Sequence, residues 1–267
     1  MSELDNDVFP QKIICLTEES VETLYLLKRE SLIRGVSAFA KRPDEAQKLP
    51  KVSFFTSSNY KKISALKPDL IIGHSDIQKD IARDLIELGH NVFIANHRSL
   101  TGILGYIGLL ARMVAAQEAG KLLVDKLRTK LEETKKLTQN LQNKPKVYFE
   151  EWDEPLISSI QWVSELIDIC GFEPIFSNRS QGILAKDRFV THDEIIAANP
   201  DIIFACWCGK KADLKSIAMR KGYEQINAIK NGKVFELAPE VFLQPGPAPI
   251  IDGIDILLSF NYALNGE

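Results

Sequence analysis

The sequence predicts an α/β protein with two Rossmann-like lobes, each built on a parallel sheet, joined by one long rigid α-helix. The chain has 267 residues, enough for two lobes of about 100 residues each. Strand-like and helix-like segments alternate in both halves, a pattern typical of parallel sheets. Between the halves, residues 101–143 contain no proline and repeat apolar residues at helical spacing. We therefore expect lobes at 1–100 and 144–267 and a connecting helix at 101–143.

The first half contains apolar runs that indicate buried strands. In the middle of this half, Pro68 stops a helix and Asp69 favours a turn before an uninterrupted apolar run. We expect strands at residues 12–16, 70–73 and 91–95 and a helix at 21–28.

The second half repeats this order. Pro200 and Asp201 again separate a helical segment from an apolar run, as Pro68 and Asp69 do. We expect strands at residues 146–150, 202–205 and 233–237 and helices at 162–170 and 250–262. Three matches in the same order indicate that the two halves arose by duplication.

The connecting segment has an apolar stripe along most of its length, which includes Leu104, Leu110, Leu122, Leu131 and Leu137. A helix of about 40 residues would be a rod of roughly 60 Å. Such a spacer would resist hinge bending and hold two ligand-facing walls at a nearly fixed spacing. The sequence therefore predicts a largely preformed cleft between the lobes.

Composition excludes some classes of function. The net charge is −3, so there is no basic excess to bind nucleic acid. No apolar run approaches the roughly 18–20 residues that span a bilayer. The N-terminus is acidic and lacks the basic and apolar regions of a secretory signal, which favours a cytoplasmic protein. The alternative is a periplasmic or cell-surface protein whose signal has been removed.

Ligands of open α/β sheets lie beyond the carboxyl ends of the strands. Aromatic residues concentrate in the loops that would occupy this position, and flat aromatic walls suit a large organic ligand. The candidates are Phe39, Phe54 and Phe55 from the first lobe and Trp152, Trp162, Trp207 and Phe242 from the second. The alternative for each ring is that it seals the core of its lobe.

Three polar features accompany these rings. His74 directly follows a strand and is a candidate axial ligand to a metal, a hydrogen-bond donor or a residue at a helix start. Glu150 and Glu151 share a loop with Trp152, where they could contact a polar ligand or act in acid–base chemistry. Cys206 and Cys208 lie two apart in a strand-like run, so a metal or redox pair stays open beside the simpler interpretation of free thiols.

Motifs of common enzymes are missing. There is no glycine-rich phosphate loop, no His-Glu-x-x-His and no Gly-x-Ser-x-Gly. We therefore expect a binding protein that requires no cofactor and has no catalytic residues.

Several motifs together resemble class III substrate-binding proteins of ABC importers, a group that handles vitamin B12, haem and iron-siderophore complexes. The two Pro-Asp motifs carry part of the resemblance. The motifs Glu-Trp-Asp-Glu-Pro at 151–155, Trp-Val-Ser-Glu-Leu at 162–166, Cys-Gly at 208–209 and Gln-Pro-Gly-Pro at 244–247 resemble the cobalamin-binding branch. The resemblance covers about residues 12–260.

The resemblance implies a set of ligand contacts. B12-binding members place aromatic residues where Phe39, Phe55 and His74 lie, an acidic residue near Glu240 and a basic one near Gln244. In this chain, His74 replaces an aromatic wall with a candidate cobalt or iron ligand. Gln244 removes a positive charge.

The resemblance also implies a permease partner, which importing members bind through a surface glutamate on each lobe. The first of these positions is Lys61, which would repel the permease arginines; Glu224 is the counterpart in the second lobe. With the missing signal, this favours a cytoplasmic carrier or sensor of a corrinoid or similar chelate. The alternatives are an exported importer component for vitamin B12, haem or a siderophore, and a chelatase-like enzyme that uses His74 with Glu150 or Glu151.

Overall fold

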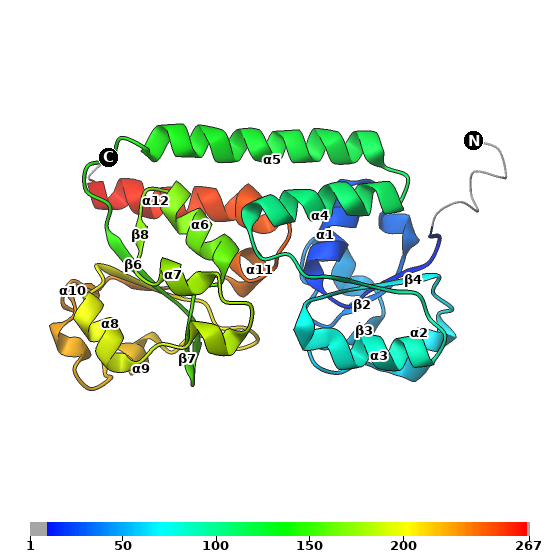
Figure 1. The fold of residues 1–267 in the computed structure, drawn as a ribbon, viewed down its shortest axis with the longest axis horizontal. Helices are drawn as coiled ribbons and strands as arrows, with labels where there is room; N and C mark the ends of the chain where they lie inside the picture. Colours follow the sequence, from blue (N-terminus) through cyan, green and yellow to red (C-terminus); the bar gives the residue numbers. More distant parts are fainter. Residues whose placement is uncertain (1–9, 266–267) are drawn as a thin grey trace. The chain divides into compact units, whose positions relative to one another are not determined.

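The computed structural model describes residues 10–265 and divides into two compact units. The first unit comprises the described residues up to His97 and Thr101–Arg128; the second comprises Arg98–Leu100 and the residues from Thr129 onward. Figure 1 shows the elements in chain order. The acidic N-terminal segment, on which the prediction of a cytoplasmic protein rested, lies outside the described residues.

The first unit is built on a five-stranded parallel sheet in the order β3-β2-β1-β4-β5. Its strands are β1 (Ile13–Cys15), β2 (Ile33–Ser37), β3 (Lys51–Ser53), β4 (Leu70–His74) and β5 (Val92–Ala95). The central β1 and β4 are buried throughout, because helices cover both faces of the sheet. The three strands that the sequence predicts here are confirmed.

Short helices connect these strands. They are α1 (Glu18–Leu26), η2 (Glu30–Leu32), η3 (Asp44–Lys48), α2 (Tyr60–Ala65), η4 (Asp76–Gln78) and α3 (Lys79–Glu87).

The second unit has a mixed sheet in the order β10-β9-β6-β7, with β8 paired to β6. Its strands are β6 (Lys146–Asp153), β7 (Leu156–Ser158), β8 (Glu173–Pro174), β9 (Ile202–Ala205) and β10 (Val234–Glu236). β7 runs antiparallel to β6, whereas the pairs β10–β9, β9–β6 and β6–β8 are parallel, so the predicted parallel sheet is confirmed except at this edge strand. Only Glu154 and Pro155 join the two strands, and a connection this short permits only a hairpin.

Helices again link the strands of the second unit. They are α6 (Gln161–Ile169), α7 (Ser177–Ser180), η5 (Ala185–Arg188), α8 (His192–Ala198), α9 (Leu214–Ala218), η6 (Tyr223–Gln225), α10 (Asn227–Lys230), α11 (Pro239–Phe242), η7 (Pro249–Gly253) and α12 (Ile254–Asn265). The predicted last helix therefore begins as a π-helical turn, η7, before α12.

The aspartates of the two Pro-Asp motifs accept equivalent backbone hydrogen bonds in the two units. Asp69 accepts hydrogen bonds from the backbone N–H groups of Gln11 and Lys12, at 2.8 and 2.9 Å. Asp201 accepts one from the backbone N–H of Lys146 at 2.9 Å. Asp69 thus holds the start of β1 beside β4, and Asp201 holds the start of β6 beside β9. This equivalence supports the predicted duplication.

The predicted single helix at 101–143 is wrong, because the segment forms two helices. They are α4 (Leu100–Met113) and α5 (Gln117–Thr138). The chain turns at Ala115, whose φ of 50° is left-handed, and the N–H of Ala116 bonds to the carbonyl of Ala111 at 2.8 Å. Arg29 stabilises the end of α4 by donating to the carbonyl oxygens of Val114 and Ala115, at 3.0 and 2.8 Å.

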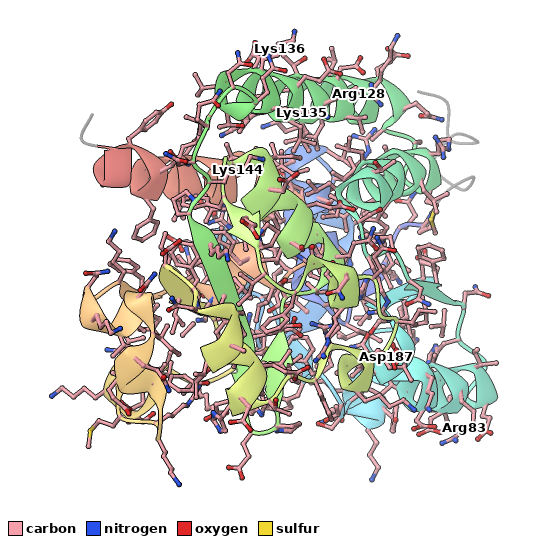
Figure 2. The ribbon with its side chains drawn as sticks, turned by 60° about the vertical axis from the view of Figure 1, so that its left-hand side comes forward. Arg83, Arg128, Lys135, Lys136, Lys144 and Asp187 are labelled. Carbon is pink, nitrogen blue, oxygen red and sulfur yellow. The ribbon has the colours of Figure 1, made fainter. Side chains whose placement is uncertain are left out.

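α4 and α5 form a helical hairpin about the turn at Ala115, visible in Figure 1. Gly120 of α5 lies so close to α4 that an added Cβ would stand 2.2 Å from the Cβ of Ala111. The predicted apolar stripe is only partly buried, since Leu122 of α5 is 72% exposed while Leu127 is buried. Lys135 and Lys136 of α5, which Figure 2 labels, are both exposed.

The boundary between the two units falls inside α5, after Arg128. At 22 residues, α5 is about 33 Å long, roughly half the length expected for an unbroken rod. No helix of the described part of the chain has the length and apolar character needed to cross a membrane.

Candidate functional site

The parallel sheet of the first unit brings the carboxyl ends of its five strands to one edge. Three phenylalanines follow β2 and β3 at this edge and contact one another. The ring of Phe39 lies 4.8 Å from that of Phe55 and 6.0 Å from that of Phe54, between ring centroids. Phe54 is exposed and the other two are half-buried, so the cluster offers apolar surface to a ligand. Two predicted site residues of this unit, Phe39 and Phe55, are thus side by side.

His74 ends β4 and points into a second aromatic group. Its ring packs edge-on against His97 at 4.9 Å, and His97 stacks on Tyr106 of α4 at 4.8 Å. His74 is 8% exposed, and its Nε2 lies 3.1 Å from the carbonyl oxygen of His97. A metal bound through Nε2 would have to replace this hydrogen bond. Direct ligand contact by His74 stays a prediction.

Gln78 is a functional candidate that the sequence did not reveal. It is fully buried, accepts from the backbone N–H of His74 at 3.0 Å, and donates to the carbonyls of Leu16 and Phe55, both at 3.3 Å. It therefore ties the ends of β1 and β4 to the loop that carries the phenylalanines. Gly73 makes room for it, because a Cβ there would lie 2.4 Å from the Gln78 Oε1.

In the second unit, β6 ends in the acidic segment that the sequence singles out. Glu150 has 0% exposure and forms a bidentate pair with Arg220, at 2.5 and 2.9 Å. It also accepts from the indole Nε1 of Trp207 at 3.1 Å. Arg220 thus balances the negative charge of Glu150. The hydrogen bond to the Glu150 carboxylate fixes the orientation of Trp207.

Glu151 is paired in the same way, with Arg188 at 2.5 and 2.9 Å. Arg188 is buried and also donates to the Ser158 carbonyl on β7 at 2.7 Å. Both glutamates therefore have a guanidinium partner, an arrangement suited to holding loops in place.

Trp152 and Trp207 come together around Lys210. The Lys210 Nζ lies 4.3 Å from the ring centroid of Trp152 and 4.7 Å from that of Trp207. It also donates to both carboxylate oxygens of Asp153, at 2.7 and 2.8 Å. The structure thus joins two predicted ring residues, Trp152 and Trp207, through a lysine that sequence reasoning missed.

Three of the remaining predicted residues, Trp162, Phe242 and Gln244, lie in the interior of the second unit, and Glu240 is half-buried on α11. Trp162 is buried and donates its indole N–H to the carbonyl of Phe242 at 2.8 Å; the Phe242 ring is fully buried next to Gly253. Gln244 is buried and donates to the Glu240 carbonyl at 2.7 Å. Ligand contact by these residues stays a prediction, and for Trp162 and Phe242 it would need rearrangement of the core.

The two cysteines of this region lie outside β9, which ends at Ala205, so the predicted strand-like placement is wrong. Cys206 is fully buried, and burial raises the pKa of its thiol well above the usual range. The thiol therefore stays protonated at neutral pH and is a poor nucleophile. Within residues 10–265, no three histidine, cysteine or acidic side chains gather as a metal site would require.

Comparisons with known proteins agree with this architecture. A vitamin B12-binding protein of Vibrio cholerae is 26% identical over 245 residues, covering 90% of this chain and 85% of that protein. An uncharacterised ABC transporter substrate-binding lipoprotein, YvrC of Bacillus subtilis, is 24% identical over 262 residues, covering 95% and 80%.

Among solved structures, the periplasmic haem-binding protein RhuT of Roseiflexus sp. RS-1 superposes with a TM-score of 0.80 at 19% identity. The superposition covers 95% of this chain and 98% of that one, which establishes a shared fold. Residues 13–241 match the sequence profile of a family described as periplasmic binding protein. Since that match extends over most of its length, this chain belongs to the periplasmic binding protein family.

Proposed function

We propose that this protein is the substrate-binding component of an ABC importer and that its ligand is a corrinoid such as cobalamin. The observation that carries the proposal is the similarity to the V. cholerae vitamin B12-binding protein over 90% of the chain. The apolar surface of the exposed Phe54 and the half-buried Phe39 and Phe55 supports it, because a corrin ring presents a broad, largely apolar face.

An importer role replaces the cytoplasmic carrier expected from the sequence. The relatives are named as periplasmic or lipoprotein binding proteins, which favours the exported alternative. Glu150 and Glu151 are each held in an ion pair with an arginine, and this structural role also supports a binding protein over acid–base chemistry.

Titration of the purified protein tests the ligand. We expect cyanocobalamin and hydroxocobalamin to bind with a shift of the corrinoid absorption bands and to displace each other. Haem is the competing ligand, and preferential haem binding would instead assign the protein to the haem-binding members of the family.

Substitution of Phe39 locates the binding surface. Phe39→Ala removes a ring that packs on Phe55, and we expect corrinoid affinity to fall by about tenfold. Tyr262→Ala is a matched control, because Tyr262 is an exposed aromatic residue on α12. Equal affinities of the two variants would remove the phenylalanine cluster from the proposed site.

The proposed importer role also requires the protein to dock onto a permease. Lys61 is exposed in the first turn of α2, and Glu224 is exposed in η6. If each contacts permease arginines, as the resemblance implies, Lys61→Glu should strengthen association with the cognate permease in detergent, and Glu224→Lys should weaken it. Unchanged association in both variants would place docking elsewhere.

A further inference from the structure

The ammonium group of Lys210 lies against two indole rings and one carboxylate, three partners that suit an organic cation. Two indole rings face it at 4.3 and 4.7 Å, within the range of favourable cation–π contacts. Asp153 supplies the counter-charge through both of its oxygens, at 2.7 and 2.8 Å. We name Trp152, Asp153 and Trp207 the ammonium cage.

The walls of the cage are held independently of Lys210. The Trp207 indole is 3% exposed and anchored by its N–H to Glu150, which is itself held by Arg220. The Trp152 indole donates to the Glu154 carbonyl at 2.9 Å. A cage built in this way keeps its shape when the cation leaves, so another cation can enter without the cost of reorganisation.

The occupant is held less firmly than the walls. The Lys210 side chain is 42% exposed, and its flexible four-carbon stem can swing into solvent. Its departure would leave the carboxylate of Asp153 uncompensated beside two electron-rich ring faces. The vacated cage therefore has a net negative charge and favours a new cation.

We propose that the ammonium cage is a binding site for a primary ammonium group of a ligand, and that Lys210 occupies it in cis until such a ligand displaces it. The two hydrogen bonds to Asp153 select a primary ammonium, because a quaternary ammonium has no N–H to donate. The ligand class is an organic molecule or chelate with a pendant primary amine. The site does not depend on the identity of the chelate proposed above.

Chemical rescue tests the cage directly. Lys210→Ala removes a fragment equivalent to propylammonium, which then serves as the probe. The chain has three tryptophans, so an ¹H–¹⁵N spectrum resolves three indole signals, with that of Trp162 as an internal reference. We expect the Trp152 and Trp207 signals to move in Lys210→Ala and to return saturably toward their wild-type positions as propylammonium is added.

The controls separate the cage from general effects of charge. Wild type should bind propylammonium at least about tenfold more weakly than Lys210→Ala, because its own lysine competes at high effective concentration. Tetramethylammonium should bind Lys210→Ala more weakly than propylammonium, and the uncharged 1-propanol should not shift the signals. Lys211→Ala, which removes the neighbouring lysine, should behave as wild type.

Two results would overturn the proposal. One is the absence of a saturable response to propylammonium in Lys210→Ala; the other is an undiminished response when Asp153→Asn is combined with Lys210→Ala. Cobalamin titration of the same variants is a separate readout, so failure of the cage and failure of the corrinoid proposal are distinguishable.

Discussion

Glu19 places a carboxyl group in the interior of the first unit, where it is 1% exposed. The Thr17 hydroxyl donates to it at 2.5 Å. Burial, with a smaller contribution from the charge of Glu18, raises the pKa of Glu19 to about 8, so the side chain is mainly neutral at pH 7. Its neighbours Cys15 and Tyr106 also have raised pKa values, because of burial, and do not ionise near neutral pH.

The raised pKa of Glu19 predicts a loss of stability with increasing pH. Between the ordinary value of 4.5 and about 8, the folded state holds a proton that the unfolded state has released. The free energy of unfolding should therefore decrease by up to about 1.4 kcal/mol per pH unit across this window, and be greatest below it. Urea unfolding of wild type and Glu19→Gln at pH 5.5 and 8.5 measures the effect. The glutamine variant should lose less stability, and identical pH dependence in both proteins would contradict the assignment.

For individual residues, clusters on a surface could be predicted from the sequence more accurately than the contacts of each side chain. Phe39 and Phe55 were expected to share a surface, and they do. The pairing of Glu150 with Arg220 could not be foreseen, because the two residues are 70 positions apart and no local pattern connects them.

The α4–α5 hairpin is the element that departs most from expectation. Its turn contains no glycine or proline, so neither of the usual signals for a helix end is present. The left-handed Ala115 is stabilised from outside the segment by Arg29, a contact between residues more than 80 positions apart. The Pro-Asp turns were predictable for the opposite reason, since proline and aspartate act locally.

Close packing within the hairpin predicts an unusual response to alanine substitution. Gly120→Ala should destabilise the protein by about 1–3 kcal/mol, because the new methyl group would collide with Ala111. Gly105→Ala is the control: this glycine lies in α4 with no atom within 4 Å of an added Cβ, and the change should stabilise by about 0.5–1 kcal/mol. Thermal unfolding compares both variants with wild type. A neutral Gly120→Ala would show that the two helices can separate at little cost.

On the scale of the whole molecule, α5 passes through the boundary between the two units as one unbroken helix. A continuous helix bends less than a loop, so we expect the orientation of the units to change by only a few degrees when ligand binds. Spin labels on cysteines introduced at Glu87 and Lys221, two exposed positions in different units, would report this in a Cys208→Ser background. Distance distributions that coincide with and without ligand are expected, whereas a shift of many ångströms would indicate hinge closure.

The two-unit α/β plan was predictable from sequence because it depends on repeated local patterns. The mixed edge of the second sheet depends instead on the short connection between β6 and β7. The identity of the ligand depends on a few side chains at strand ends, and these are positioned by contacts that the sequence does not reveal.

Calorimetric titration of the full chain with cyanocobalamin measures whether the protein binds a corrinoid. We expect a saturable heat with one corrinoid bound per chain, weakened in Phe39→Ala and retained in Tyr262→Ala. No heat with cyanocobalamin, together with stoichiometric binding of haem under the same conditions, would contradict this expectation.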